Sequence, residues 1–231
     1  MSTARQLVDY VNKQLLRRRG FELHRTHKSE VFLSNRLAMR FLYFARRFDE
    51  ISHLSGDVVE CGVASGRGLL MLAYLIKSEN KGRQLWGFDT FCGLPKPGEF
   101  DTGSRDVEGR LAWSEDDVRS MLVRSDVGER FIDSHIHLMR GLVEDTLPSY
   151  QGKKIALLHL DLDLYSGYKA SLENLFKFVV PGGIIMFDEY HGKRDLEKWP
   201  GAKAAVDEFF KENTRKIKYD RAADKYFFTK I

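Results

Sequence analysis

Apolar residues follow two different spacings along the chain. In residues 3–18, and again from about 31 to 51, they recur at helical spacing with arginines between them, which predicts two amphipathic helices. Farther along, they form short uninterrupted runs instead. The pattern therefore predicts N-terminal helices over residues 1–52, as a lid or subunit interface, and a separate domain over residues 53–231.

Five short apolar runs in the second part predict strands buried on both faces, because apolar residues fill them without strict alternation. In chain order they are DVVECGV, QLWGF, IHLMR, KIALLHL and GIIMF. Helical stretches lie between them, and one of these, 114–124, opens with Ser114 and has Asp117 three residues on, as in a capping box. Strands that alternate with helices predict a doubly wound, mostly parallel α/β sheet. The tail, KIKYDR followed by KYFFTK, predicts a terminal antiparallel hairpin.

Length and composition fit this organisation. The 231 residues are 43% hydrophobic, which suits one globular domain with additions. No run approaches the roughly 18–20 apolar residues of a membrane span, and the start of the chain lacks the pattern of a secretory signal. Neither of the two cysteines, Cys61 and Cys92, belongs to a metal-spaced pair, so we expect a reduced, cytoplasmic protein.

The net charge of +4 is unevenly distributed. Residues 1–48 contain 11 Lys and Arg against 3 Asp and Glu, a balance of +8, so the remainder carries −4. Such a basic arm can meet a phosphate, a nucleic acid, a membrane surface or an acidic subunit, or it can be a solvated helix face. Charge alone does not choose between these.

The end of the first predicted strand, ECGVASGRG, contains a glycine-rich turn. Its spacing differs from the dinucleotide fingerprint G-x-G-x-x-G. Glu60, two residues before the first glycine, fits a site that accepts a cation such as the ammonium of methionine, although a plain strand-to-helix turn explains the glycines equally well. Asp89, at the end of the second strand, is placed to accept hydrogen bonds from ribose hydroxyls, in S-adenosylmethionine or in a nicotinamide dinucleotide.

Carboxylates end the fourth and fifth predicted strands. Asp161 and Asp163 occupy alternate positions, which in an extended chain project to one side. Asp188 and Glu189 follow the fifth strand. If these strands are neighbours, the acids converge, and a hard divalent cation such as Mg²⁺ is the usual partner of oxygen ligands of this kind.

The phrases GDVVECGVASGRG, LWGFDTFCGLPKP, SEDDVR, MRGLVEDTLP, IALLHLDLDLY and VPGGIIMFDEY occur in an order that resembles the macrocin O-methyltransferase family. The resemblance runs from about residue 30 to 210. It implies a Rossmann-like class I methyltransferase fold, S-adenosylmethionine and Mg²⁺ as cofactors, and methyl transfer to a hydroxyl of a sugar, in a glycoside, a nucleotide sugar or a natural product.

The resemblance also implies roles for individual residues. Three acids match the metal ligands: Asp161, Asp188 and Glu189. The second acid of the strand-four pair, Asp163, matches the general base. The cofactor pocket is expected from Glu60, Gly62, Val63, Ser65, Asp89, Thr90, Phe91, Gly141 and Asp161. Two departures stand out: the family usually has Asp-Asp-Tyr where this chain has Asp188-Glu189-Tyr190, and an aromatic residue where this chain has Ala64.

The segment Thr90–Trp113 is too long for an ordinary connection and is typical of a lid or binding loop. Phe91 and Trp113 are candidates either to stack on adenine or to anchor this loop in the core. His191, after the metal motif, is a candidate substrate contact or an incidental residue.

Three other functions stay open. A methyltransferase of a catechol or other phenol shares the fold and the metal, with Lys169 as a weak alternative base. A nucleic-acid methyltransferase would use the basic arm, but the sequence shows neither a stacking platform nor a base-flipping motif. A non-catalytic cofactor-binding module has no need for two carboxylate pairs. The apolar faces of the N-terminal helices further predict a homo-oligomer.

Overall fold

The structure, a computed structural model, describes residues 35–103, 107–152 and 154–231. The helix predicted at 3–18 and the start of the second predicted helix lie outside the described residues. The rest of the second helix is present as α2, Asn35–Glu50. The chain divides into two compact units, Met1–Ala38 and Met39–Ile231. The second unit contains the sheet and everything described below.

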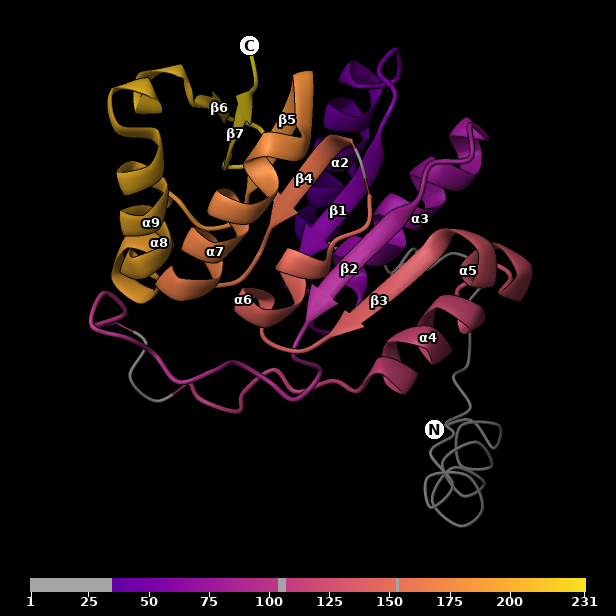
Figure 1. Ribbon diagram of the computed structural model, residues 1–231, viewed down its shortest axis with the longest axis horizontal. Coiled ribbons are helices and arrows are strands. Elements are labelled where there is room, and N and C mark those ends of the chain that lie inside the picture. Colours follow the sequence, from indigo (N-terminus) through magenta and orange to yellow (C-terminus); the bar gives the residue numbers. More distant parts are fainter. Residues whose placement is uncertain (1–34, 104–106, 153) are drawn as a thin grey trace, which may run out of the picture. The chain divides into compact units, whose positions relative to one another are not determined.

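A seven-stranded sheet forms the centre of this unit, in the order β3-β2-β1-β4-β5-β7-β6 (Figure 1). The five predicted runs are its parallel strands: β1 Asp57–Cys61, β2 Leu85–Asp89, β3 Ile136–Arg140, β4 Ile155–Leu160 and β5 Val179–Phe187. The predicted tail hairpin consists of β6 Lys218–Asp220 and β7 Lys225–Thr229, and β7 lies antiparallel beside β5. The doubly wound sheet with a terminal antiparallel hairpin is confirmed.

Helices cover both faces of the sheet, so each face has a hydrophobic cluster of its own. The first cluster packs beneath α2, α3 Arg67–Glu79, α4 Glu115–Arg124 and α5 Glu129–His135. The second packs beneath α6 Val143–Thr146, α7 Tyr165–Leu175 and α9 Pro200–Phe210. Short helical pieces complete the connections: η3 Leu147–Ser149, η4 Phe176–Phe178, α8 Lys193–Lys198 and η5 Lys211–Lys216. Within the described part of the chain, no helix has the length and apolarity needed to cross a bilayer.

The strand order reverses between β1 and β4. Strands β1, β2 and β3 follow one another toward one edge, and β4 and β5 continue toward the other. In open α/β sheets, ligands bind at the carboxyl ends of the strands beside such a reversal. All six residues of β4 and four of the five in β1 are buried, and Glu60 and His159 are the polar ones among them.

The N-terminus of α4 carries the capping box that the sequence predicts. The hydroxyl of Ser114 accepts a hydrogen bond from the backbone N–H of Asp117 at 3.1 Å, and the Asp117 carboxylate accepts one from the backbone N–H of Ser114 at 3.0 Å. We expect Ser114→Ala to lower the free energy of unfolding by about 1 kcal/mol, because it removes this acceptor. Urea denaturation measures the effect. Ser166→Ala, at an exposed position in the first turn of α7, is the control and should change stability much less.

Candidate active site

A glycine turn joins β1 to α3 at the carboxyl edge of the sheet. Gly62 and Gly66 have φ of 89° and 79°, values that side-chain-bearing residues rarely adopt. Gly62 also lies against β4: a Cβ there would stand 1.8 Å from the carbonyl oxygen of Asp161. Gly66 lies against α4, where a Cβ would stand 2.5 Å from the side chain of Met121. The glycine turn is therefore held between the end of β4 and helix α4.

Asp89, predicted to bind ribose, holds this turn in place. One carboxylate oxygen accepts hydrogen bonds from the backbone N–H groups of Val63 and Ala64 at 2.8 and 2.9 Å. The other accepts from the N–H of Phe91 at 2.8 Å. A carboxylate offers about four acceptor positions, so Asp89 keeps some capacity for a ligand. Its structural role is one that the sequence analysis did not assign.

An open pocket of about 630 Å³ begins at the glycine turn and extends along the carboxyl ends of β2 and β4. Five of the predicted site residues line it: Gly62, Asp89, Thr90, Asp161 and Asp163. Other lining residues are Ala64, Gly93, Leu94, Pro95, Leu111, Leu142, Val143, Glu144, Leu162, Leu164 and Gly167. The remaining predicted cofactor residues do not belong to this lining: Val63, Ser65, Phe91 and Gly141 are adjacent in sequence to a lining residue, and Glu60 lies two residues before Gly62.

Phe91 is a core residue. Its side chain is 5% exposed and packs in the hydrophobic cluster beneath α3, so the anchor hypothesis holds for it and stacking on adenine does not. Trp113 is 46% exposed and does not line the pocket. The predicted lid segment instead gives the pocket Leu94, Pro95 and Leu111, which the sequence analysis did not single out.

Asp161 and Asp188 lie side by side at the ends of β4 and β5, as predicted, and two basic side chains bind them. The guanidinium of Arg40, from α2, reaches Asp161 at 2.7 Å with one nitrogen and Asp188 at 2.9 Å with the other. The ammonium of Lys225, from β7, lies 3.0 Å from the second oxygen of Asp188. The negative charges of the two carboxylates are thus balanced by the positive charges of Arg40 and Lys225.

These contacts separate the two carboxylates in acidity. Desolvation, and then the negative charge of Asp188, raises the pKa of Asp161 to about 6 against the opposing effect of Arg40. Desolvation acts in the same direction on Asp188, but the positive charges of Arg40 and Lys225 outweigh it and hold the pKa of Asp188 below its ordinary value. Asp161 is therefore the first of the pair to take up a proton.

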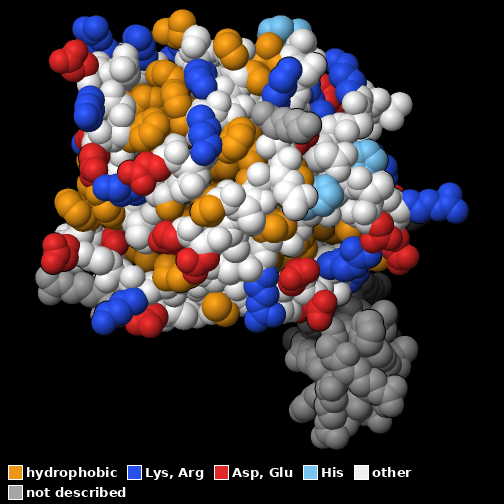
Figure 2. Space-filling view, in the orientation of Figure 1, with side chains coloured by type: hydrophobic (Ala, Val, Ile, Leu, Met, Phe, Trp, Pro, Cys, Tyr) orange, Lys and Arg blue, Asp and Glu red, His pale blue; other side chains and the backbone are white. Residues whose placement is uncertain are grey.

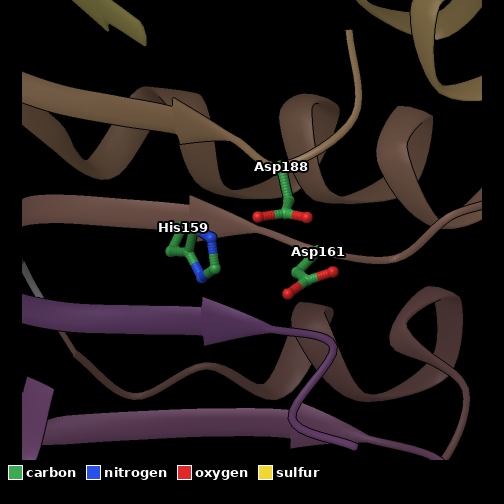
Figure 3. A group of neighbouring side chains, drawn as sticks. All are labelled: His159, Asp161 and Asp188. Carbon is green, nitrogen blue, oxygen red and sulfur yellow. The ribbon is translucent and has the colours of Figure 1, made fainter. Parts of the chain in front are cut away.

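His159 joins this pair from the strand itself. A ring nitrogen of His159 and one carboxylate oxygen each of Asp161 and Asp188 lie within 4.8 Å of one another. Figure 3 shows these three side chains. Nδ1 of His159 lies 3.0 Å from a carboxylate oxygen of Glu60. The sequence analysis missed His159, although it stands two residues before Asp161 and so shares its face of β4.

Glu189 lies next to Asp188 and also contacts Tyr168 of α7. It is 3% exposed, and its carboxylate lies 2.8 Å from the hydroxyl of Tyr168, which is also 2.8 Å from the carbonyl of Leu160. A tyrosine hydroxyl has one proton and cannot donate to both acceptors. Burial, followed by the charges of Asp161 and Asp188, raises the pKa of Glu189 well above its ordinary value, which agrees with a protonated Glu189 that supplies the missing hydrogen.

Asp163 occupies a strained turn. Strand β4 ends at Leu160, so the alternation assumed from the sequence does not reach Asp163. The N–H of Leu164 donates to the carbonyl of Leu162 at 2.6 Å, and Asp163 between them has φ of 63°. This is the rare γ-turn with positive φ. Strain of this type is concentrated at functional sites, and the turn places Asp163 in the pocket lining beside Asp161.

Comparison with known proteins assigns the family. The sequence matches the macrocin O-methyltransferase (TylF) family over residues 41–222. The chain belongs to this family. The matched range contains the glycine turn, Asp89 and all the predicted metal ligands, whereas Arg40 lies one residue before it.

Relatives of known function are similar over part of their length. A demethyldecarbamoylnovobiocin O-methyltransferase from Streptomyces niveus is 30% identical over 165 residues, 68% of this chain and 59% of that protein. The 8-demethyl-8-(2,3-dimethoxy-alpha-L-rhamnosyl)-tetracenomycin-C 4'-O-methyltransferase from Streptomyces olivaceus is 33% identical over 143 residues, 58% of this chain and 53% of that protein. The chain thus spans a little over half the length of these curated relatives.

Solved structures agree with the fold. The O-methyltransferase NovP superimposes with a TM-score of 0.71 at 26% identity, over 83% of this chain and 79% of that one. The calicheamicin methyltransferase CalS11 gives a TM-score of 0.73 at the same identity and coverage. These comparisons confirm the class I methyltransferase fold that the sequence predicts.

Two further residues singled out in the sequence analysis, Ala64 and Lys169, have defined positions in the structure. Ala64 lines the pocket at a position where the family usually has an aromatic residue, so this part of the cavity is not filled by a large side chain. Lys169, considered as a base for a phenol, is occupied elsewhere: its ammonium lies 2.8 Å from Glu208 and 3.3 Å from the hydroxyl of Tyr165.

Proposed function

We propose that the protein is an S-adenosylmethionine-dependent O-methyltransferase that acts on a hydroxyl of a sugar and binds a divalent cation, Mg²⁺ or another hard one. One observation carries the proposal: a single pocket is lined both by the glycine turn with Asp89 and by Asp161 with Asp163. Cofactor and acceptor can therefore meet in one cavity.

Each end of the pocket suits one part of S-adenosylmethionine. Asp89 and Thr90 would bind the ribose hydroxyls, and the apolar lining residues would contact adenine: Leu94, Leu111, Leu142 and Val143. The backbone at Gly62 and Ala64 leaves room for the methionine portion, which would direct the sulfonium methyl toward Asp161 and Asp163. In the reaction, the acceptor oxygen forms a bond to the methyl carbon while the carbon–sulfur bond breaks. The carboxylate of Asp163 would accept the proton of the hydroxyl.

The donors at the strand ends fit a divalent cation. The two carboxylates that would hold it, Asp161 and Asp188, are ligands that hard cations prefer. When bound, the cation would lower the pKa of the acceptor hydroxyl. Arg40 bridges the same two oxygens in the structure and would have to move aside. Glu189 would have to leave the hydroxyl of Tyr168 before serving as the third ligand.

The acceptor class is proposed from the relatives. The Streptomyces olivaceus relative is named as a 4'-O-methyltransferase of a rhamnosyl tetracenomycin. The phenol alternative loses its candidate base, because Lys169 is held by Glu208 and Tyr165. The nucleic-acid alternative gains no support from Figure 2, where Lys and Arg on the visible face are interspersed with Asp and Glu.

Calorimetric titration and an acceptor panel test the proposed function. We expect S-adenosylmethionine to bind in the micromolar range, and methyl transfer to a panel of rhamnosides and other glycosides to exceed transfer to catechol, measured by the formation of S-adenosylhomocysteine. A protein that does not bind S-adenosylmethionine is not a methyltransferase. One that binds it and methylates only catechol contradicts the sugar assignment. Light scattering at micromolar concentration tests the homo-oligomer predicted from the sequence.

A further inference from the structure

A buried histidine faces the two carboxylates from the interior of the sheet. His159 is 1% exposed, on the strand β4 that also leads to Asp161. The ring of Phe44 packs edge-on against the imidazole, with the ring centroids 4.9 Å apart. Strand β4 and the contact with Phe44 hold the imidazole in one orientation, so each of its two nitrogens faces a particular neighbour.

Glu60 determines which of these nitrogens is free. Nδ1 of His159 lies 3.0 Å from Oε1 of Glu60, on the neighbouring strand β1, and Glu60 is also 1% exposed. The same oxygen packs against the first turn of α3, where a Cβ on Gly68 would stand 2.0 Å from it. Glu60 therefore cannot turn away easily. An ionised Glu60 only accepts hydrogen bonds, so with Glu60 in this form Nδ1 carries the hydrogen and Nε2 keeps a lone pair.

Nδ1 is engaged by Glu60, which leaves Nε2 as the ring nitrogen available to a metal. A ring nitrogen of His159 lies within 4.8 Å of one carboxylate oxygen of Asp161 and one of Asp188. Figure 3 shows the imidazole directed from β4 toward the space beside the two carboxylates. A carboxylate that orients a histidine whose other nitrogen binds a metal is a recurrent arrangement in metalloproteins.

We propose that His159 is a nitrogen ligand of the cation held by Asp161 and Asp188, and that Glu60 is the positioning residue that orients it. This inference rests on the proposed function, since it concerns the same metal site. It replaces an all-oxygen set by two carboxylates and an imidazole. Imidazole favours transition metals, whereas Mg²⁺ prefers oxygen ligands alone. The site should therefore bind Mn²⁺ with a preference over Mg²⁺ that depends on His159.

The test compares metal binding by the full chain and two variants. His159→Leu removes both nitrogens at nearly constant volume, and Glu60→Gln preserves shape but removes the carboxylate. By calorimetry we expect each variant to bind Mn²⁺ about 10–100-fold more weakly than the unmodified protein, with a smaller loss for Mg²⁺. Urea denaturation of each variant is the control for folding.

A spectroscopic measurement covers the case in which the variants do not fold. Pulsed EPR of the unmodified protein with Mn²⁺ should show coupling to one nitrogen of an imidazole. Absence of this coupling, or an unchanged affinity for Mn²⁺ in folded His159→Leu, overturns the role of His159. The methyltransferase proposal survives that outcome if S-adenosylmethionine still binds and methyl transfer still occurs. A protein that binds neither Mn²⁺ nor Mg²⁺ overturns this inference together with the metal part of the proposed function.

Discussion

Asp161→Asn is expected to reduce kcat/KM for methyl transfer by about 1,000-fold, which corresponds to about 4 kcal/mol of lost transition-state stabilisation. The amide keeps the size of the side chain but loses the charge that attracts a cation. Asp161 is a better choice than Asp188, because Asp188 binds both Arg40 and Lys225, and its loss would leave two cations without their main partner. Among the described residues, the only basic side chain that forms an ion pair with Asp161 is Arg40, and Arg40 retains Asp188.

The measurement combines initial rates with calorimetry. Metal affinity should fall together with kcat/KM, while S-adenosylmethionine affinity changes less, because the pocket lining near Asp89 is unaffected. Asp133→Asn is a matched control: this carboxylate also pairs with an arginine, Arg119, but on an exposed surface. Asp133→Asn should leave the metal affinity and kcat/KM unchanged. An Asp161→Asn protein that keeps full activity would show that the charge of this carboxylate does not contribute to the reaction.

The sheet could be predicted because its strands are buried on both faces. Strand β4 is buried along its whole length, and this burial requires the uninterrupted apolar run IALLHL. The capping box of α4 could be predicted for a similar reason, since both partners lie within four residues. Each of these features depends on neighbouring positions in the sequence.

The contacts of the carboxylates could not be predicted in this way. Arg40 and Asp161 are 121 residues apart, and nothing near Arg40 distinguishes it from the other arginines of the basic arm. Glu189 bonds to Tyr168 because α7 passes beneath the end of β5, which is a property of the packing. His159 is different, because its position two residues before Asp161 can be read from the sequence. The sequence analysis missed it because it considered only oxygen ligands for the cation.

The γ-turn at Asp163 shows a further limit. Alternating positions predict a common face only while the chain remains extended, and β4 ends before this residue. Asp161 and Asp163 nevertheless line the same pocket. The prediction of proximity agreed with the structure, but the reason given for it was wrong.

Gly62→Ala is expected to disturb the cofactor turn and the carboxylate site together. The new Cβ would stand 1.8 Å from the carbonyl oxygen of Asp161, and backbone atoms cannot rotate away as a side chain can. The φ of 89° adds strain of its own. We expect the free energy of unfolding to fall by about 2–5 kcal/mol, as the sum of backbone strain and overpacking. Urea denaturation measures this loss, and calorimetry should show weaker S-adenosylmethionine binding.

Gly82→Ala is the control that separates backbone strain from overpacking. Gly82 has a comparable φ of 73°, but a Cβ there would meet nothing within 4 Å. It should therefore cost only the backbone strain, about 1–2 kcal/mol, and leave cofactor binding intact. Equal decreases in the free energy of unfolding for the two variants would mean that β1 and β4 can move apart at Gly62 at no cost in stability. The position of Asp161 would then be independent of the glycine turn, and the two halves of the pocket would act as separate sites. A larger loss at Gly62, accompanied by weaker metal binding, would show that the turn and the metal ligand are mechanically coupled.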